Sequence, residues 1–159
     1  MQGILSMSSG EATTPELSYD RTNTGSGAPR PGVLSNPYNF SGAANWGCPA
    51  NRQSITCWFN PAAYAIPPLA PGQTFATEFG NAGVGTLRGP AQYNLDSSLF
   101  KSFDLRDGIN LELRGEVFNV FNTAEFGLPN QYVDTPQAGS ITSTVHSSRQ
   151  IQVAMKLTF

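Results

Sequence analysis

The sequence predicts an all-β, antiparallel fold, and two alternating stretches carry that prediction. From Ile151 to Phe159 every odd position is large and apolar, and every even position is polar or small. Because successive side chains of a strand point to opposite faces, this stretch forms one strand with an apolar and a polar face. Residues 91–104 and 109–122 also alternate, and Asp107-Gly108 between them supplies the positive φ of a tight hairpin turn.

The lengths of the connections add information that the alternation lacks. An alternating strand is equally typical of a soluble β-sandwich and of a transmembrane β-barrel. Residues 9–90 and 123–148 are long and polar, whereas the turn at 107–108 is short. Outer-membrane barrels have short periplasmic turns and longer extracellular loops. With Phe159 at the periplasmic edge, the turn is periplasmic and both long segments are extracellular.

We therefore expect the C-terminal strands of a transmembrane outer-membrane β-barrel with long extracellular loops. Four strands cannot close, and a membrane-spanning sheet must close, so either several chains share one barrel or a longer barrel supplies the other strands. The first ten residues lack the basic and apolar regions of a signal peptide, which favours a fragment of a longer barrel. The expected organisation is a partial strand 1–8, a loop 9–90, strands 91–104, 109–122 and 149–159, and a loop 123–148.

Such a fragment, taken alone, should form a curved antiparallel sheet of about three or four strands with open edges. We expect residues 8–90 to be poorly ordered apart from local aromatic clusters, since loops of this length are usually functional or disordered. The aromatic residues expected to pack this loop are Tyr38, Phe40, Trp46, Trp58, Phe59, Tyr64 and Phe75.

The composition agrees with strands that are partly in lipid. Only 13% of the residues are charged, whereas a globular domain has about a quarter. The net charge of -2 does not indicate a nucleic-acid-binding protein, which would carry a basic patch. No run of about 18 apolar residues could form a membrane-spanning helix.

Side-chain parity divides the strands into a lipid face and a lumen face. The residues predicted to face lipid are Leu111, Leu113, Val117, Ile151, Val153, Met155, Leu157 and Phe159. The charged residues Asp96, Glu112, Arg114, Glu116 and Lys156 have the lumen parity. We expect these charges to pair across strands rather than to act in acid–base chemistry.

The two cysteines, Cys48 and Cys57, lie in a stretch rich in Gly, Asn and Pro. A metal site needs more ligands than this, and the single histidine, His146, is distant in sequence and expected to be solvated. We favour a disulfide in the first extracellular loop over free thiols, which implies an oxidising compartment. No catalytic, cofactor-binding or metal-binding residues are predicted.

An ordered set of short motifs runs from about residue 57 to the C-terminus. The motifs are Cys57-Trp58-Phe59-Asn60-Pro61-Ala62-Ala63-Tyr64, Phe79-Gly80-Asn81-Ala82-Gly83, Thr86-Leu87-Arg88-Gly89-Pro90, Asn94 to Phe103, Leu113 to Asn122, Phe126-Gly127, Gly139 to Ser143 and Arg149 to Gln152. Together they resemble the C-terminal part of the Oar-like family of TonB-dependent outer-membrane transporters. That resemblance implies a parent barrel of about 22 strands, an N-terminal plug and a segment that contacts TonB.

The expected function is that of a C-terminal fragment of a TonB-dependent receptor in the cell outer membrane. It would contribute barrel closure, and extracellular loops for uptake of a bulky ligand. The expected partners are outer-membrane lipid, the barrel-assembly machinery and an unidentified ligand, with TonB reached only through N-terminal parts outside this chain. Neither enzymatic activity, a cofactor nor nucleic acid is expected. The alternatives are a surface adhesin-type barrel anchor formed by several chains and a soluble β-sandwich binding module.

Overall fold

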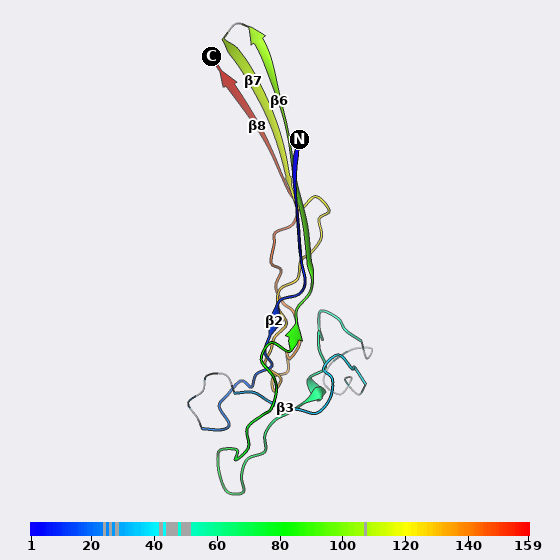
Figure 1. The fold of residues 1–159 in the computed structure, drawn as a ribbon, viewed down its shortest axis with the longest axis vertical. Coiled ribbons are helices and arrows are strands. Elements are labelled where there is room, and N and C mark those ends of the chain that lie inside the picture. The colour runs from blue at the N-terminus through cyan, green and yellow to red at the C-terminus, as the bar shows by residue number, and fades with distance from the viewer. Residues whose placement is uncertain are drawn as a thin grey trace. The chain divides into compact units, whose positions relative to one another are not determined.

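The computed structural model describes residues 1–23, 25, 27, 29–41, 43, 48, 52–106 and 108–159. The chain divides into two compact units (Figure 1). Unit 1 consists of Met1–Ser9, Ala91–Phe126 and Thr144–Phe159, and unit 2 consists of Gly10–Pro90 and Gly127–Ser143. The two long segments between the strands therefore contribute most of their residues to a unit of their own.

Unit 1 is built on one four-stranded antiparallel sheet. Its strands are β1 (Gln2–Ser8), β6 (Gln92–Arg106), β7 (Ile109–Phe118) and β8 (Gln150–Thr158), in the order β1-β6-β7-β8. In Figure 1 they run side by side, with β8 at one edge and the N-terminal strand at the other. The sheet is open, as expected for four strands, and no described strand pairs with the outer side of β1 or β8.

The hairpin differs from its predicted limits at both ends. β6 continues two residues beyond 104, to Arg106, and the register shifts between Asp104 and Arg106. Asp107 lies outside the described residues, but Gly108 has the positive φ, 83°, that a tight turn requires. β7 ends at Phe118 rather than at 122, because Asn119 turns the backbone into the left-handed region at φ 52°.

The strand register places like residues side by side. Leu111 lies opposite Leu157, Leu113 opposite Met155 and Val117 opposite Ile151. The alternate rows are polar, with Glu112 opposite Lys156 and Glu116 opposite Gln152. The sheet therefore has one mainly apolar face and one mainly polar face, since residues directly opposite each other point to the same side.

Unit 2 has little regular structure but a packed core. Two short ladders join β2 (Ala12–Thr13) to β5 (Leu87–Arg88) and β3 (Gly32–Val33) to β4 (Tyr64–Ala65). A 3-10 helix, η3 (Pro61–Ala63), is capped by Asn60, whose side chain accepts the amide hydrogen of Ala62. The buried cluster comprises Leu17, Phe59, Ala63, Tyr64, Ala82, Leu87 and Val133.

This core corrects the expectation that residues 8–90 pack only in local clusters. Leu17 and Leu87 are 70 positions apart in the chain, and Val133 comes from the second long segment. Backbone hydrogen bonds support the same association, since Glu16 N donates to Gln131 O and Val133 N donates to Glu16 O. The pattern could not be read from either segment alone, because the two segments build the core together.

The structure joins Cys48 to Cys57 by a disulfide, with Cα atoms 5.1 Å apart. The pair is buried with Ala43, and Phe40 packs against it. Among the other aromatic residues, the Phe59 and Tyr64 rings meet edge to face with centroids 6.0 Å apart. Trp46 lies outside the described residues.

Among the described residues, no helix is both long and apolar enough to span a membrane.

Candidate functional site

The apolar face of the sheet is exposed. Ile151, Val153 and Met155 are 67%, 83% and 72% exposed, and large apolar residues of β1 and β6, such as Leu5 and Leu99, are also exposed. The register places seven of the residues predicted to face lipid on this one face, and Phe159 follows directly after β8. Their contact with lipid stays a prediction.

The charged side chain of Lys101 interrupts the apolar face. Lys101 lies opposite Leu113, in the same row as Met155. Its ammonium group is 5.9 Å from the ring centroid of Phe103, the next apolar residue towards the turn at Gly108. A long side chain of this kind can bury its methylene groups and carry its charge towards the nearer boundary of an apolar layer.

The charges on the polar face pair differently from the prediction. Arg114 lies between two carboxylates of its own strand, 3.3 Å from Glu112 Oε1 and 3.8 Å from Glu116 Oε1. Its cross-strand neighbours are Phe100 and Ala154, so no charged group lies directly opposite it. The expected cross-strand pairing is therefore wrong for Arg114, which is paired along the strand.

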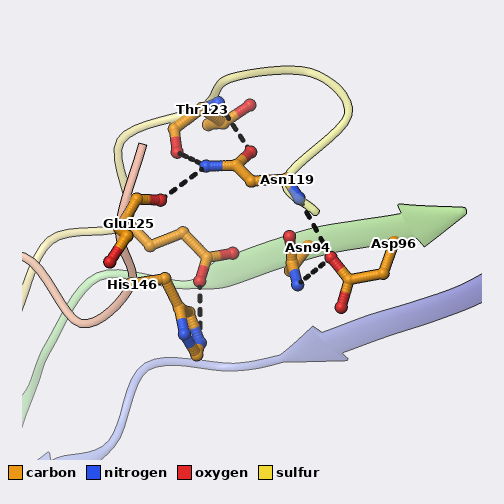
Figure 2. A network of polar contacts seen from close by, with 7 residues as sticks. Asn94, Asp96, Asn119, Thr123, Glu125 and His146 are labelled. Carbon is orange, nitrogen blue, oxygen red and sulfur yellow. Dashed lines mark hydrogen bonds and ion pairs between the residues drawn. The ribbon is translucent and has the colours of Figure 1, made fainter. Parts of the chain in front are cut away.

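A polar network lies where β6 and β7 meet the loop that follows β7 (Figure 2). Asp96 Oδ1 accepts hydrogen bonds from the backbone N–H of Asn119 at 2.9 Å and from the amide of Asn94 at 3.1 Å. The carboxylate of Asp96 thus satisfies the first backbone amide beyond β7. A charge-assisted bond of this kind fixes where the strand ends.

Asn119 is the centre of this network. The residue is 7% exposed, and its side-chain oxygen accepts the N–H of Thr123 at 3.0 Å. Its amide nitrogen donates to Thr123 O at 3.0 Å and to Ser147 O at 3.2 Å. One side chain therefore joins the chain leaving β7 to the chain entering β8. Asn is suited to this position because it tolerates the left-handed conformation and hydrogen-bonds nearby backbone.

The second element of the site is a carboxylate paired with the only histidine. Phe126 and Thr144 form an antiparallel bridge, and Val145 N donates to Glu125 O at 2.8 Å. This pairing brings His146 Nε2 to 3.3 Å from Glu125 Oε2 (Figure 2). The Glu125 side chain is 4% exposed and that of His146 is 52% exposed. His146 is therefore exposed to solvent, as predicted, and also contacts a buried carboxylate.

Glu125 is a buried acid whose carboxylate lacks hydrogen-bond donors in the part of the chain that the structure describes. Neither carboxylate oxygen has a hydrogen-bond partner among the described residues, and the contact with His146 lacks hydrogen-bond geometry. A buried carboxylate is costly unless a cation or donor compensates it. Beside it lies a cavity of about 90 Å³, which Glu125 and His146 line together with Ser6, Met7, Ser8, Gln92 and Asn94. A larger cavity, of about 260 Å³, shares His146 and Asn94 and includes Asp96 and Asn119.

Sequence reasoning found only part of this site. Asp96 was assigned to the polar face, and the register agrees. Asn119 and Glu125 were missed, because their roles arise when residues 144–147 return beside the chain that leaves β7. The pair of Asn residues at 119 and 122, both at φ 52°, is the one local signal that could have located the end of the strand. In the described part of the chain, no group of three or more His, Cys, Asp or Glu side chains could hold a metal ion.

Comparison with known proteins gives the family. The family model described as "Outer membrane beta barrel domain" matches residues 1–152. No curated protein and no solved structure matches the chain. The match covers β1, β6 and β7 completely and the first three residues of β8. The chain therefore belongs to the outer membrane beta barrel domain family, and it is a protein of the outer membrane.

Proposed function

We propose that the chain is the C-terminal barrel section of a TonB-dependent, Oar-like receptor that takes up a bulky ligand. In this role unit 1 contributes four wall strands, and unit 2 is a folded extracellular structure that contacts the ligand. The single observation that carries the proposal is the two-faced open sheet, whose exposed apolar residues and free edges need lipid and further strands. The ordered motifs between residues 57 and 159 support the transporter class.

The proposed role is not enzymatic and needs no cofactor. On the polar face, Arg114 forms ion pairs along β7 with Glu112 and Glu116, and polar side chains are what the lumen of a barrel requires. The proposed partners are outer-membrane lipid, the barrel-assembly machinery and the ligand, without nucleic acid. Energy coupling through TonB would require parts of a transporter that lie outside this chain.

The open edges also favour a second candidate, an adhesin-type anchor in which several copies share one barrel. In that arrangement β1 of one copy would pair with β8 of the next. A soluble β-sandwich receives less support, because its second sheet would cover residues such as Val153, which is 83% exposed here. The two membrane candidates differ in what lies beside β8.

Cysteine cross-linking at the outer edges of β1 and β8 distinguishes the transporter from the shared barrel. In outer membranes containing the protein, Gly3→Cys and Val153→Cys are introduced together, and oxidation is followed by non-reducing electrophoresis. The transporter proposal predicts no ladder of identical copies, because the edges pair with other strands of the same barrel. A ladder ending at one fixed number of copies would favour the shared barrel. Leu34→Cys with Val153→Cys is the matched control, since residue 34 is exposed in unit 2 rather than on a sheet edge.

A further inference from the structure

We propose that the polar face of the sheet binds an organic cation, a guanidinium or ammonium group carried on an apolar chain, at Asp96 and Phe118. All residues of this site belong to unit 1. The inference rests on the proposed function, since it gives the ligand of the proposed receptor a chemical class.

The first argument is the position of Asp96 and Phe118 at two hollows. Both residues line a hollow of about 240 Å³, together with others such as Ile4 and Glu116. Both also line a hollow of about 260 Å³, which includes Gln150. A site for a whole drug-sized ligand usually encloses about 300–1,000 Å³. Each hollow therefore has room for one group of a larger ligand, and Asp96 and Phe118 border both.

The second argument is the unused half of the Asp96 carboxylate. Its Oδ1 accepts the N–H of Asn119 and the side-chain amide of Asn94. Among the described residues, no donor reaches Oδ2, and Asp96 takes part in no ion pair (Figure 2). One oxygen thus fixes the carboxylate in place, while the other is available to a ligand. A donor that carries positive charge makes the stronger hydrogen bond to a carboxylate.

The third argument is the charge of the two linings. Neither lining contains Lys or Arg, and Glu116 adds a second carboxylate to the hollow of about 240 Å³. Arg114 is engaged by two carboxylates of its own strand, and His146, in the other lining, contacts Glu125. A concave surface lined by one sign of charge attracts ligands of the opposite sign. A neutral ligand could donate the same hydrogen bonds, but it would leave the charge of Asp96 uncompensated.

The fourth argument is the exposed apolar surface beside this charge. Phe118 lies opposite Gln150 on the polar face and is 39% exposed. A cation over an aromatic ring is attracted by the negative face of the ring. Ile4, directly opposite Asp96 on β1, is 67% exposed and offers apolar surface to the chain that carries the cation. Carboxylate, ring and aliphatic side chain together fit a charged group on an apolar body.

The test uses an introduced thiol. Both cysteines of the chain are joined in the disulfide, so a new cysteine is the only free one. Ser148→Cys places it in the lining of the hollow of about 260 Å³. Its reaction with N-ethylmaleimide is measured by peptide mass spectrometry on the full chain in outer-membrane vesicles, as butylguanidinium or its uncharged isostere butylurea is added. We expect butylguanidinium to protect the thiol at a concentration about tenfold or more below that of butylurea. Ser102→Cys, on the same face but in neither lining, should be protected by neither probe.

The variants Asp96→Asn and Asp104→Asn, each combined with Ser148→Cys, make the matched comparison. Both aspartates lie on β6 and accept a hydrogen bond from an asparagine side chain, but only Asp96 lines the hollows. Asp96→Asn keeps an oxygen for the N–H of Asn119 and removes the charge. It should raise the butylguanidinium concentration for half-protection about tenfold or more, whereas Asp104→Asn should leave it unchanged.

Phe118→Leu keeps an apolar side chain and removes the ring, so it should raise the same concentration about threefold. This variant keeps the test valid if Asp96→Asn misfolds. Equal protection by the two probes, protection by neither, or unchanged half-protection in both Asp96→Asn and Phe118→Leu would overturn the proposal. Such a result would leave the receptor itself standing, because the cross-linking of the sheet edges tests that separately.

Discussion

At the residue scale, Asn119 determines how the chain passes from β7 to β8. Its backbone is left-handed at φ 52°, and its buried side chain makes three hydrogen bonds to backbone groups of Thr123 and Ser147. The position therefore combines two requirements, a rare backbone conformation and a set of polar partners, that few residue types meet together.

Substitution of Asn119 separates those two requirements. Asn119→Ala should reduce the free energy of unfolding by about 3 kcal/mol, because the hydrogen bonds are lost and alanine is strained at positive φ. Asn119→Gly should cost about 1 kcal/mol less, since glycine adopts this conformation without strain. Urea unfolding of the protein in vesicles, followed by protease cleavage between residues 119 and 149, measures both. Equal losses in the two variants would show that the backbone conformation carries no cost.

Tyr64 is the titratable group with the clearest environment. Burial in the core of unit 2 raises the pKa of its hydroxyl to about 12, and the hydrogen bond with Thr86 lowers it in part. Because this pKa is raised in the folded state, the protonated Tyr64 hydroxyl contributes fully to the stability of unit 2 below pH 10. That contribution is lost as pH rises towards 12. A shift of about two units corresponds to about 2–3 kcal/mol at most.

The expected result is a loss of stability of unit 2 between about pH 10 and pH 12. Tyr64→Phe should abolish the loss of stability that ionisation of the Tyr64 hydroxyl causes, because phenylalanine keeps the ring and cannot ionise. Tyrosinate absorbance follows the titration, and the variant should lack the component with the highest pKa. A variant that titrates like the natural protein would contradict the assignment to Tyr64.

At the residue scale, the sequence predicted those contacts whose partners are close together in the chain. A disulfide between the two cysteines was favoured over free thiols, and the structure joins them. Asn119 and Glu125 were not found, since their partners at residues 145–147 are about 20 or more positions away in the chain. Such partners become visible only when the topology is known.

At the element scale, β7 and β8 have matched apolar rows. The central pair Leu113 and Met155 is flanked by Leu111 with Leu157 and by Gly115 with Val153. In lipid, burying each large side chain contributes about 1.5–3 kcal/mol. In water the same rows leave the sheet with an exposed apolar surface, which favours association.

Charge substitutions on the two faces of β8 should therefore differ. Met155→Arg places a charge on the apolar face and should cost about 2–4 kcal/mol of stability in the membrane. Gln152→Arg is the matched control, because its position lies opposite Glu116 on the polar face and gains an oppositely charged neighbour. Folding of the assembled protein in vesicles, measured by heat-dependent mobility, checks both. A reversed order of the two effects would mean that the faces are exchanged.

The long first loop gives a further prediction at this scale. Cys48 and Cys57 enclose a short segment, so losing the disulfide should cost about 2–3 kcal/mol on the chain-entropy account. Mass spectrometry of alkylated, non-reduced protein from the membrane should find no alkylated cysteine. Two alkylated thiols would contradict the bond, and Cys48→Ser with Cys57→Ser provides the stability reference.

Element types were predictable because hydrophobic period and turn residues are local signals. The alternation found the three long strands, and Asp107-Gly108 indicated the hairpin. Strand ends were less accurate, since β7 stops at Phe118 for reasons that include the distant Asp96. The core of unit 2 was missed because its short ladders, such as β2 with β5, leave no periodic pattern in the sequence.

At the scale of the whole molecule, we expect the open sheet to require both lipid and neighbouring strands. The outer edges of β1 and β8 present backbone groups that none of the described strands pairs. In lipid each unpaired group costs several kcal/mol. The isolated chain should therefore conduct no ions across a bilayer and should aggregate in water. Size-exclusion chromatography with thermal unfolding checks this, and a monodisperse soluble monomer that melts cooperatively would disagree.

We expect the face that carries Ile151, Val153, Met155 and Leu157 to contact lipid. The most direct measurement places a spin-labelled cysteine at each position from 150 to 158 in outer-membrane vesicles and compares its accessibility to oxygen and to a water-soluble relaxation agent. We expect a period of two, with the odd positions accessible to oxygen and the even positions to the water-soluble agent. No alternation, or alternation with even positions in lipid, would contradict it.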